Sequence, residues 1–297
     1  MIKNEVVSAD WMSRVSDDKR ITEINIPGTH DSLARFVAFT IITRTQSASL
    51  EEQLGMGVRY FDFRFIKTAR GLVAAHGGIR CKASGGIFAP EITADSVAQA
   101  CIRFLKKHPT ETVLFQLKED KGGAGDSFYS EFYNTVIKGN ADRWFAQNRI
   151  PTLGEVRGKI VLLRAVSVDK EAFDETNSGI NFDSYPYIGS KKINDYRCGK
   201  IADLNGNGYE EMHVQDSYKL EMKKKWQAVK GFLEADLDKR NFNICLLSCT
   251  GIFQPYLNAR FVNNEFMEYE LRKKEYGIIA VDYVDHEICR KIYETNY

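Results

Sequence analysis

Eight short stretches rich in β-branched and aromatic residues recur along the chain, and this repetition restricts the folds available to it. Several are apolar almost throughout, as strands buried on both faces tend to be. They span residues 21–28, 58–66, 72–77, 112–119, 159–166, 213–219, 243–250 and 277–284. Helical patterns occupy residues 50–55, 93–107, 127–138, 219–238 and 258–274. Alternation of about eight strands with helices is typical of a (β/α)8 barrel.

The alternation is uneven, which predicts an α/β fold of the irregular, partly open TIM-like kind. Two of the predicted strands lie close together within residues 58–77, and residues 167–212 form a long irregular stretch. Thr93 is a plausible N-cap for the helix at 93–107, and Gly55 a plausible C-cap for the helix at 50–55. No repeat or Pro/Ser-rich linker divides the chain, so we expect residues 1–297 to form a single domain.

Composition excludes several classes of function. The formal net charge of +1 gives no global attraction to nucleic acid. The six cysteines form no CxxC pair and no zinc-type spacing, which predicts reduced, mostly buried thiols, although disulfides stay open if the protein is exported. The N-terminal residues lack the apolar core of a signal peptide, and no apolar run is long enough to span a membrane.

Polar side chains stand at the C-terminal ends of nearly all the predicted strands. In a barrel these ends converge on one face, where active sites form. Strands selected for stability alone would not need such side chains, so we expect the functional site at this face. The residues are His30, Asp31, Asp62, Arg64, His76, Lys118, Arg164, Asp216, Tyr218 and Asp282.

One histidine follows the first predicted strand and another follows the third. Pro27 and Gly28 turn the chain sharply and leave His30 at the strand end, whereas His76 precedes two glycines. A histidine titrates near neutrality and can exchange a proton with an alcohol. Taken alone, His30 is equally well an ordinary loop residue and His76 a buried core residue. Their combination with an arginine between them favours catalysis.

Alternation divides the strand at 58–66 into two faces. One face carries Arg59 and three phenylalanines, and the other carries Tyr60, Asp62 and Arg64. If the second face lines the barrel, Arg64 either forms a plain salt bridge with Asp62 or, oriented by it, clamps a phosphate through two hydrogen bonds.

Cleavage of a phosphodiester by internal attack needs a base, an acid and a cation that stabilises the phosphorane. His30, His76 and Arg64 can supply these roles. Asp282 emerges from the last predicted strand, and the first and last strands of a closed barrel are neighbours. We therefore expect Asp282 to reach His30 and to fix the tautomer of its ring.

Residues 203–211 partly match a calcium-binding loop. Val214 stands where the bidentate glutamate belongs, so an Asn-Gly turn leading into a strand is the favoured interpretation. The remaining histidines look structural: His108 lies at a helix end, His213 is expected to begin a strand, and His286 belongs to the surface or to a helix cap.

Seven motifs, taken together, resemble the bacterial phosphatidylinositol-specific phospholipase C family, within the phospholipase C X-region superfamily. Each is weak alone, but the set covers most of the chain in the family's order. The motifs are PGTHDS (27–32), GVRYFDFRF (57–65), AHGG (75–78), FLKKHPTETVLFQLKED (104–120), RGKIVLL (157–163), VQDSYK (214–219) and AVDYVD (280–285). The resemblance implies an irregular TIM-like barrel and a lyase that converts phosphatidylinositol into diacylglycerol and inositol 1,2-cyclic phosphate.

The resemblance also implies roles for single residues. His30 is the general base on the inositol 2-hydroxyl and Asp282 orients it. His76 is the general acid toward the diacylglycerol oxygen and is supported by Asp31. Arg64 stabilises the phosphorane.

Further residues are implied as substrate contacts. Lys118, Asp216 and Tyr218 resemble inositol-binding groups, alongside Asp62. The family's inositol-binding arginine aligns with Ala165, one position from Arg164, so either Arg164 substitutes for it or the contact is lost.

No metal or other cofactor is implied. Calcium-dependent relatives carry a second carboxylate at the position of Arg64 and another acidic ligand at the position of Lys118. Asp31 is still a possible ligand, but two cations in the pocket argue against bound calcium.

Membrane contact is expected at the rim of the barrel, on membranes or micelles that contain phosphatidylinositol. Residues Phe36–Ile42 follow the catalytic loop and read either as an interfacial patch or as core. Aromatic residues of long loops are similar candidates, namely Tyr185, Tyr187, Phe253 and Tyr256.

Two other functions compete with this prediction. A glycerophosphodiesterase-like or metal-dependent barrel enzyme would lose activity with a chelator, and a catalytically silent phosphoinositide-binding module would form no product. We expect a monomer that is exported, with a leader not present in this chain; a cytoplasmic or host-delivered protein is the alternative.

Overall fold

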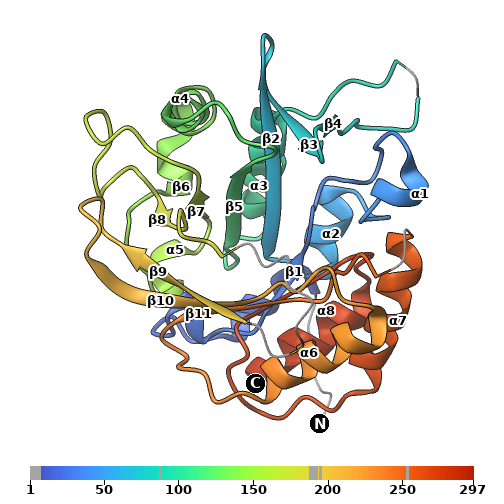
Figure 1. Cartoon of the computed structure of the whole chain (residues 1–297). Coiled ribbons are helices and arrows are strands. Elements are labelled where there is room, and N and C mark those ends of the chain that lie inside the picture. Colours follow the sequence, from blue (N-terminus) through green and yellow to red (C-terminus); the bar gives the residue numbers. More distant parts are fainter. Residues whose placement is uncertain (1–7, 87, 187–192, 194–195, 252–253) are drawn as a thin grey trace.

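The apolar strands pair side by side into one mostly parallel sheet (Figure 1). The computed structural model describes residues 8–86, 88–186, 193, 196–251 and 254–297. Within these residues the strands are β1 (Ile26–Thr29), β2 (Tyr60–Thr68), β3 (Gly71–His76), β4 (Ile79–Arg80), β5 (Val113–Glu119), β6 (Trp144–Phe145), β7 (Ile160–Ala165), β8 (Ile180–Asn181), β9 (Arg197–Ala202), β10 (Gly208–Gln215), β11 (Phe242–Leu246) and β12 (Ile278–Val281).

The order of the strands is that of an irregular barrel. Hydrogen bonds link them as β6-β7-β5-β2-β1-β12-β11-β10-β9, and every pairing from β6 to β10 is parallel. The last strand, β9, is antiparallel to β10, and β8 pairs with β7. In the part of the chain that is described, no strand pairing joins β9 to β6 or β8, so the predicted partly open barrel is confirmed.

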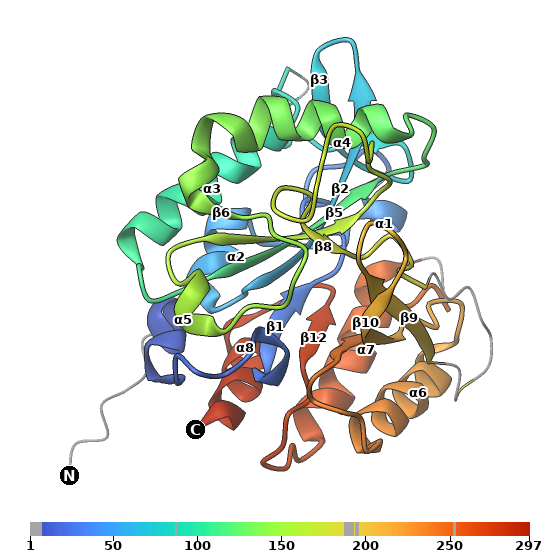
Figure 2. The same cartoon turned by 90° about the vertical axis from the view of Figure 1, so that its left-hand side faces the viewer.

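Helices surround this sheet and connect its strands. They are α1 (Thr40–Thr43), α2 (Leu50–Met56), α3 (Ala94–Lys107), α4 (Asp126–Phe132), α5 (Leu153–Val156), α6 (Met222–Glu234), α7 (Pro255–Glu268) and α8 (His286–Tyr293), with shorter turns η1 (Ser8–Arg14), η2 (Ile21–Glu23), η3 (Tyr133–Ile137), η4 (Lys138–Arg143) and η5 (Glu294–Asn296). Helices α6, α7 and α8 gather on one side, near β10 and β11 (Figure 1). Helices α3 and α4 lie on another side of the barrel (Figure 2).

Local sequence signals account for several helix boundaries. The Thr93 side chain accepts a hydrogen bond from the backbone of Ser96, so it is the N-cap of α3, as predicted. Asp285 likewise caps α8 by accepting from the backbone of Ile288. Helix α2 ends later than predicted: its C-cap is Gly57, with a φ of 109°, because a left-handed C-cap favours glycine, whereas Gly55 lies inside the helix.

Some predicted strand bounds were wrong. Residues 21–23 form the turn η2 rather than the start of β1, because the Glu23 carboxylate accepts a hydrogen bond from the backbone N–H of Arg20 and the backbone N–H of Glu23 donates to the Arg20 carbonyl. Strand β10 begins at Gly208, so His213 lies within it rather than at its start. The sequence at 58–77 forms the antiparallel hairpin of β2 and β3, which explains the uneven alternation.

The two faces of β2 separate as predicted. Phe61 and Phe63 stack with ring centroids 5.2 Å apart, and Phe63 packs against Phe115 of β5 at 4.4 Å. This apolar layer faces the surrounding helices, since Phe115 also contacts Phe132 of α4. The other face of β2 points into the barrel and therefore carries the polar side chains at its C-terminal end.

Gly28 permits a close approach between β1 and β2. A Cβ at this position would lie 2.6 Å from Cδ1 of Tyr60, well inside van der Waals contact. The hydroxyl of Tyr60 in turn bonds to the side chain of Gln116 on β5. Glycine at position 28 therefore allows three neighbouring strands to pack around one aromatic ring.

The chain contains six cysteines, and all are free thiols. Five are buried, as predicted, and Cys198 on β9 is exposed. Among the described helices, none combines the length and the apolar character needed to cross a bilayer.

A buried ion pair links the residue before β2 to the segment that precedes β5. Arg59 and Glu111 have fully buried side chains whose Nη2 and Oε2 atoms lie 2.9 Å apart. Arg59 also donates to the backbone oxygens of Leu54, Val58 and Ala9. The pair is satisfied as a unit, so removal of one member leaves a buried charge without its partner.

We predict that Arg59→Met lowers the free energy of unfolding by about 3–5 kcal/mol, the usual cost of breaking a buried ion pair. Guanidinium denaturation followed by circular dichroism measures it. The control is Arg103→Met, because Arg103 is exposed and only 3.8 Å from an exposed Glu51. Equal stabilities of the two variants would contradict the importance of the buried pair.

Candidate active site

His30 and Asp282 meet because their strands are neighbours. β1 pairs with β12 in parallel register, and the backbone N–H of His30 donates to the carbonyl of Val281 over 3.1 Å. The imidazole Nδ1 then lies 2.8 Å from Oδ1 of Asp282. The predicted contact between the first and last strands is therefore present, and Nδ1–H donation to the carboxylate leaves Nε2 to face the site.

Asp31 connects the remaining groups. One of its oxygens, Oδ2, lies 3.2 Å from Nε2 of His30 and 2.9 Å from Nδ1 of His76. The other, Oδ1, lies 2.8 Å from Nε of Arg64. Asp31 has a left-handed φ of 41°, an unfavourable conformation for a residue with a Cβ. These contacts stabilise the strained backbone of Asp31, and its conformation places the carboxylate between two imidazoles and a guanidinium.

Arg64 also contacts a second carboxylate. Its Nη2 atom is 2.7 Å from Oδ2 of Asp62, so the salt bridge weighed from the sequence is present. The other oxygen of Asp62 lies 3.0 Å from Nζ of Lys118, which is buried beneath the ring of Tyr185 at 4.1 Å. The Arg64 side chain stays 19% exposed beside an open pocket of about 480 Å³, so a further anion can reach it.

These carboxylates shift the titration of both histidines. Burial opposes the charged form of His30, but the Asp31 and Asp282 carboxylates outweigh it and raise its pKa to about 9. The Asp31 carboxylate likewise raises the pKa of His76. Asp31 itself is held ionised: burial favours its neutral form, but Arg64 and the two imidazoles lower its pKa well below the usual range.

Asp216 lies in the same electrostatic environment. Burial raises the pKa of Asp216, opposed by the positive charges of Lys225, His30 and Lys118. Lys225 of α6 is itself buried, and its Nζ donates to Oε1 of Gln215 over 2.9 Å. Tyr218 follows two residues later and is half-buried.

Arg164 is the expected site residue that the structure does not bring to the others. In the register of β5 and β7, Ala165 lies beside Lys118, whereas Arg164 lies beside Leu117 on the opposite face. The guanidinium is buried and donates to the backbone oxygens of Ser178 and Val166. Arg164 therefore does not replace the group missing at position 165 from the adjacent position.

Two residues that sequence reasoning missed hold the site together. Gln46 is fully buried and donates from Nε2 to the carbonyls of His30 (3.0 Å) and Val281 (2.9 Å). Asp120 accepts from the backbone of Gly78 and so fixes the turn that follows His76. Neither showed a signal beyond its residue type, although Asp120 ends one of the motifs quoted above.

A metal ion is also conceivable from the residue types. Ligand atoms of His30, Asp31 and Asp62 all lie within 4.8 Å of one another. Arg64 bonds to both carboxylates, however, so its guanidinium supplies positive charge where a cation would sit. These residues therefore fit an anion facing Arg64 better than a metal bound between the carboxylates.

The structure decides between the interpretations of two other sequence features. Both oxygens of Asp203 accept hydrogen bonds from Asn207, within the turn that leads into β10, as the Asn-Gly interpretation predicted. Tyr185 is buried rather than exposed at the rim, because Lys118 packs on its ring. Tyr187 and Phe253 lie outside the described residues.

No protein-family model matches the chain. Its sequence is similar to the 1-phosphatidylinositol phosphodiesterase of Listeria monocytogenes, at 26% identity over 99% of this chain and 87% of that protein. The Staphylococcus aureus protein of the same name (strain Newman) is 28% identical over 97% of this chain and 94% of its own. A structure of the S. aureus phosphatidylinositol-specific phospholipase C, concerned with modulation of its membrane binding, matches with a TM-score of 0.77, 24% identity and 98% coverage of both chains, which shows the shared fold.

We predict that Asp282→Asn lowers the pKa of His30 from about 9 by about one unit or more, since it removes one of the two carboxylates that raise it. NMR titration of the imidazole measures this. Asp285→Asn, which removes the α8 cap carboxylate instead, is the control and should leave the His30 pKa in place. An unchanged titration in Asp282→Asn would show that this carboxylate does not act on His30.

Proposed function

The chain belongs to the bacterial phosphatidylinositol-specific phospholipase C family, and from this premise we propose that it cleaves phosphatidylinositol to diacylglycerol and inositol 1,2-cyclic phosphate. One observation carries the proposal: a single carboxylate, Asp31, contacts two imidazoles and a guanidinium at once. An internal attack on phosphorus requires those three groups around one phosphate.

His30 is the proposed general base. Its Nδ1 bonds to Asp282, so Nε2 is the atom that takes the proton of the inositol 2-hydroxyl. Asp282 acts through His30 as a positioning residue, by holding the ring and stabilising the imidazolium that forms. Because the pKa of His30 is raised to about 9, the base becomes available as pH rises, and the rate climbs on the alkaline side.

His76 is the proposed general acid. Its Nδ1 lies 2.9 Å from Oδ2 of Asp31, which leaves Nε2 to protonate the diacylglycerol oxygen as the phosphorus–oxygen bond breaks. The raised pKa of His76 keeps this proton in place at neutral pH. Base and acid together give a rate that rises and then falls with pH.

Arg64 is the proposed partner of the phosphorane oxygens. A guanidinium that two carboxylates orient can present its remaining N–H groups to a phosphate without reorganisation. Because this cation is covalently part of the chain, we propose that the reaction needs no metal ion.

The inositol ring is proposed to contact Lys118, Asp216 and Tyr218, with Asp62 holding Arg64 and Lys118. Burial raises the pKa of Asp216, so this carboxyl suits hydrogen bonding to sugar hydroxyls in a dry pocket. Arg164 has no role in this proposal, because it lies on the face of the sheet opposite to Lys118 of β5 and its register neighbour Ala165 of β7.

An exposed apolar patch beside the site is the proposed membrane contact. Phe39, Ile41 and Ile42 around α1 are 73%, 71% and 52% exposed, whereas Val37 is buried. Helix α1 packs against α7, whose N-terminal turn adds Tyr256 at 52% exposure (Figure 1). Exposed apolar side chains at the end of the first loop after His30 suit insertion between lipid headgroups.

We propose that residues 1–297 act as one catalytic domain, because one buried apolar cluster includes residues from Trp11 to Tyr293. We further propose that the protein works as a monomer on an exposed membrane leaflet, outside the cell that makes it. The alternative is a cytoplasmic or host-delivered protein, which free thiols at all six cysteines suit as well as they suit an exported one.

Incubation of phosphatidylinositol micelles with the protein in excess EDTA, followed by phosphorus NMR, tests this function. We expect a cyclic inositol phosphate signal, and His30→Ala to reduce its rate by about 10²–10⁴-fold, the usual contribution of a general base. With an inositol phosphate ester of a nitrophenol, a leaving group that needs no proton, His76→Ala should recover much of its activity while His30→Ala should not.

Other outcomes support the competing functions. Activity lost in EDTA and restored by Ca²⁺ would indicate a metal-dependent phosphodiesterase. Cleavage of deacylated glycerophosphoinositol to glycerol phosphate, with no cleavage of phosphatidylinositol, would indicate a glycerophosphodiesterase. Lipid binding with no product would indicate a binding module.

We predict that Phe39→Ser combined with Ile41→Ser weakens binding to phosphatidylinositol vesicles by at least about tenfold, since each buried apolar side chain contributes about 1.5–3 kcal/mol. Vesicle sedimentation measures it. Met267→Ser, at the other end of α7, is the control. Hydrolysis of water-soluble inositol 1,2-cyclic phosphate should be unchanged in both variants, and a parallel loss of it in the double variant would place Phe39 and Ile41 in catalysis instead.

A further inference from the structure

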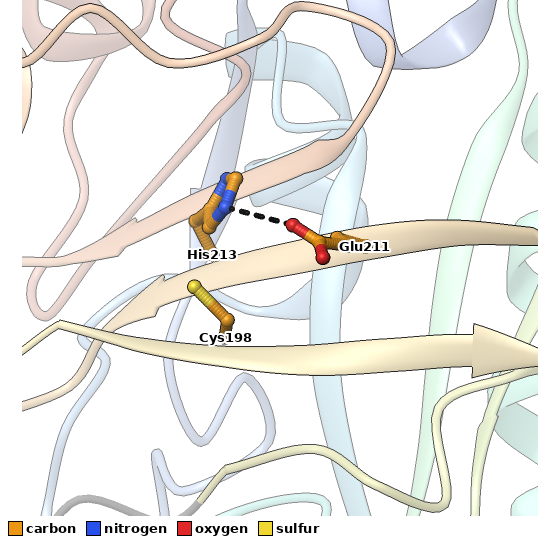
Figure 3. A group of neighbouring side chains, drawn as sticks. All are labelled: Cys198, Glu211 and His213. Carbon is orange, nitrogen blue, oxygen red and sulfur yellow. Dashed lines mark ion pairs between the residues drawn. The ribbon is translucent and has the colours of Figure 1, made fainter. Parts of the chain in front are cut away.

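A second group of chemically reactive side chains lies on the hairpin of β9 and β10, outside the proposed active site. Cys198 of β9 stands directly opposite His213 of β10 in the antiparallel register, and Glu211 lies two residues before His213. The three side chains therefore share one face of the hairpin. Their thiol, carboxylate and imidazole point toward one another (Figure 3), and their ligand atoms all lie within 4.8 Å of each other.

The imidazole of His213 is held in one tautomer. The amide nitrogen of Asn243 donates to the carbonyl of Asp238 over 3.1 Å, so its oxygen faces His213. That oxygen lies 3.0 Å from Nδ1 of His213, which must carry the proton. Nε2 is left as a lone-pair donor, 3.5 Å from a carboxylate oxygen of Glu211. A metal-binding histidine is commonly fixed by an outer hydrogen bond of this kind.

Solvent can reach Cys198 and Glu211, unlike the five other cysteines of the chain. His213 and Asn243 are buried, whereas Cys198 is exposed and the Glu211 side chain is 55% exposed. A cation can therefore enter from solvent and find one rigid ligand and two adjustable ones. The other five cysteines are buried and have no such access.

The site faces away from the proposed catalytic pocket. His213 shares a face of β10 with Gln215, which bonds to Lys225 of α6. Tyr196, which contacts the His213 ring edge-on, also packs against Phe232 of α6. The cluster therefore lies on the helix-covered side of the sheet, and its chemistry is separate from that of His30.

We propose that Cys198, Glu211 and His213 bind a divalent cation of the zinc type, with water as a fourth ligand. In a tetrahedral zinc site the metal–ligand bonds are about 2.0–2.3 Å, which places neighbouring ligand atoms about 3.5 Å apart. Side-chain rotation of Cys198 and Glu211 is enough to close the difference. A thiolate beside an imidazole selects Zn²⁺ or a similar metal over Ca²⁺ or Mg²⁺, which prefer oxygen ligands only.

Metal binding would join the last strand of the open barrel to its neighbour. β9 ends the hydrogen-bonded order of the sheet, and the proposed ion would bridge it to β10 through side chains. On binding, the Cys198 thiol gives up its proton to solvent, so the site changes by one bound cation and one released proton. The protein should gain stability in proportion to metal concentration, because the unfolded chain lacks the arrangement.

Titration of the full chain with Co²⁺, followed by absorbance, tests this site. We expect a thiolate-to-cobalt charge-transfer band with one-to-one stoichiometry, together with the visible bands of tetrahedral cobalt, and displacement of both by Zn²⁺. The other group of candidate metal ligands, His30, Asp31 and Asp62, includes no thiol, so cobalt bound there gives no such band. Absence of the band, or its persistence in Cys198→Ser, would overturn the proposal.

Variants of the other two ligands separate a built site from a lone thiol. His213→Asn should weaken cobalt binding by more than about tenfold, the least effect usual for loss of even an outer partner of a metal site, and Glu211→Gln should weaken it less. Glu210→Gln, the adjacent carboxylate that pairs with Arg20 instead, is the control and should bind normally. Affinity unchanged in both His213→Asn and Glu211→Gln would reduce the site to a single cysteine and refute it.

Lipid hydrolysis provides an independent readout. Cys198→Ser should retain it with or without EDTA, while it loses the rise in thermal unfolding midpoint that saturating Zn²⁺ gives the unmodified chain. Failure of the catalytic proposal would leave these metal titrations unaffected. A Zn²⁺-dependent rise of the same size in Cys198→Ser would contradict the hairpin site.

Discussion

A single buried carboxylate organises the proposed catalytic centre. Asp31 forms ion-pair contacts with Arg64, His76 and His30, and is held in a left-handed backbone conformation that few residues with a side chain adopt. Three ion-pair contacts of 2.8–3.2 Å offset the energy of that strain. Loss of the Asp31 carboxylate would remove the one contact that the two imidazoles and the guanidinium share, while Asp282 would still hold His30 and Asp62 would still hold Arg64.

The balance of charge around this carboxylate prepares the site for an anion. Asp31, Asp62 and Asp282 face the permanent cations Arg64 and Lys118, together with two histidines whose pKa values are raised. When both imidazoles are protonated, positive charge exceeds negative charge by one. A phosphodiester monoanion would neutralise that excess on binding. His30 acts as the proposed base only after it has lost its own proton, and transfer of the substrate proton to His30 and of the His76 proton to the leaving oxygen then leaves the total charge unchanged. The same balance supports the proposal that the reaction needs no metal ion.

The strand-end residues could be predicted from the sequence because a parallel barrel collects its strand C-termini on one face whatever the packing beneath. The contact of Asp282 with His30 followed from the adjacency of first and last strands. The position of Arg164 could not be predicted, because β7 is apolar on both faces and a shift of one residue reverses the direction of a side chain. Gln46 acts through contacts distant in sequence, and the residues of β9 are too polar to suggest a strand.

The glycine in β1 has a consequence for the spacing of β1 and β2 beneath the proposed site. Gly28 lets the ring of Tyr60 rest against the β1 backbone, and Tyr60 shares the inner face of β2 with Asp62. The distance between β1 and β2 is therefore set by the packing of Tyr60 on Gly28, below the charged side chains of Asp62 and Arg64. The distance between Arg64 and the imidazoles, which a phosphate would span in the proposed reaction, therefore depends on the absence of a Cβ at position 28.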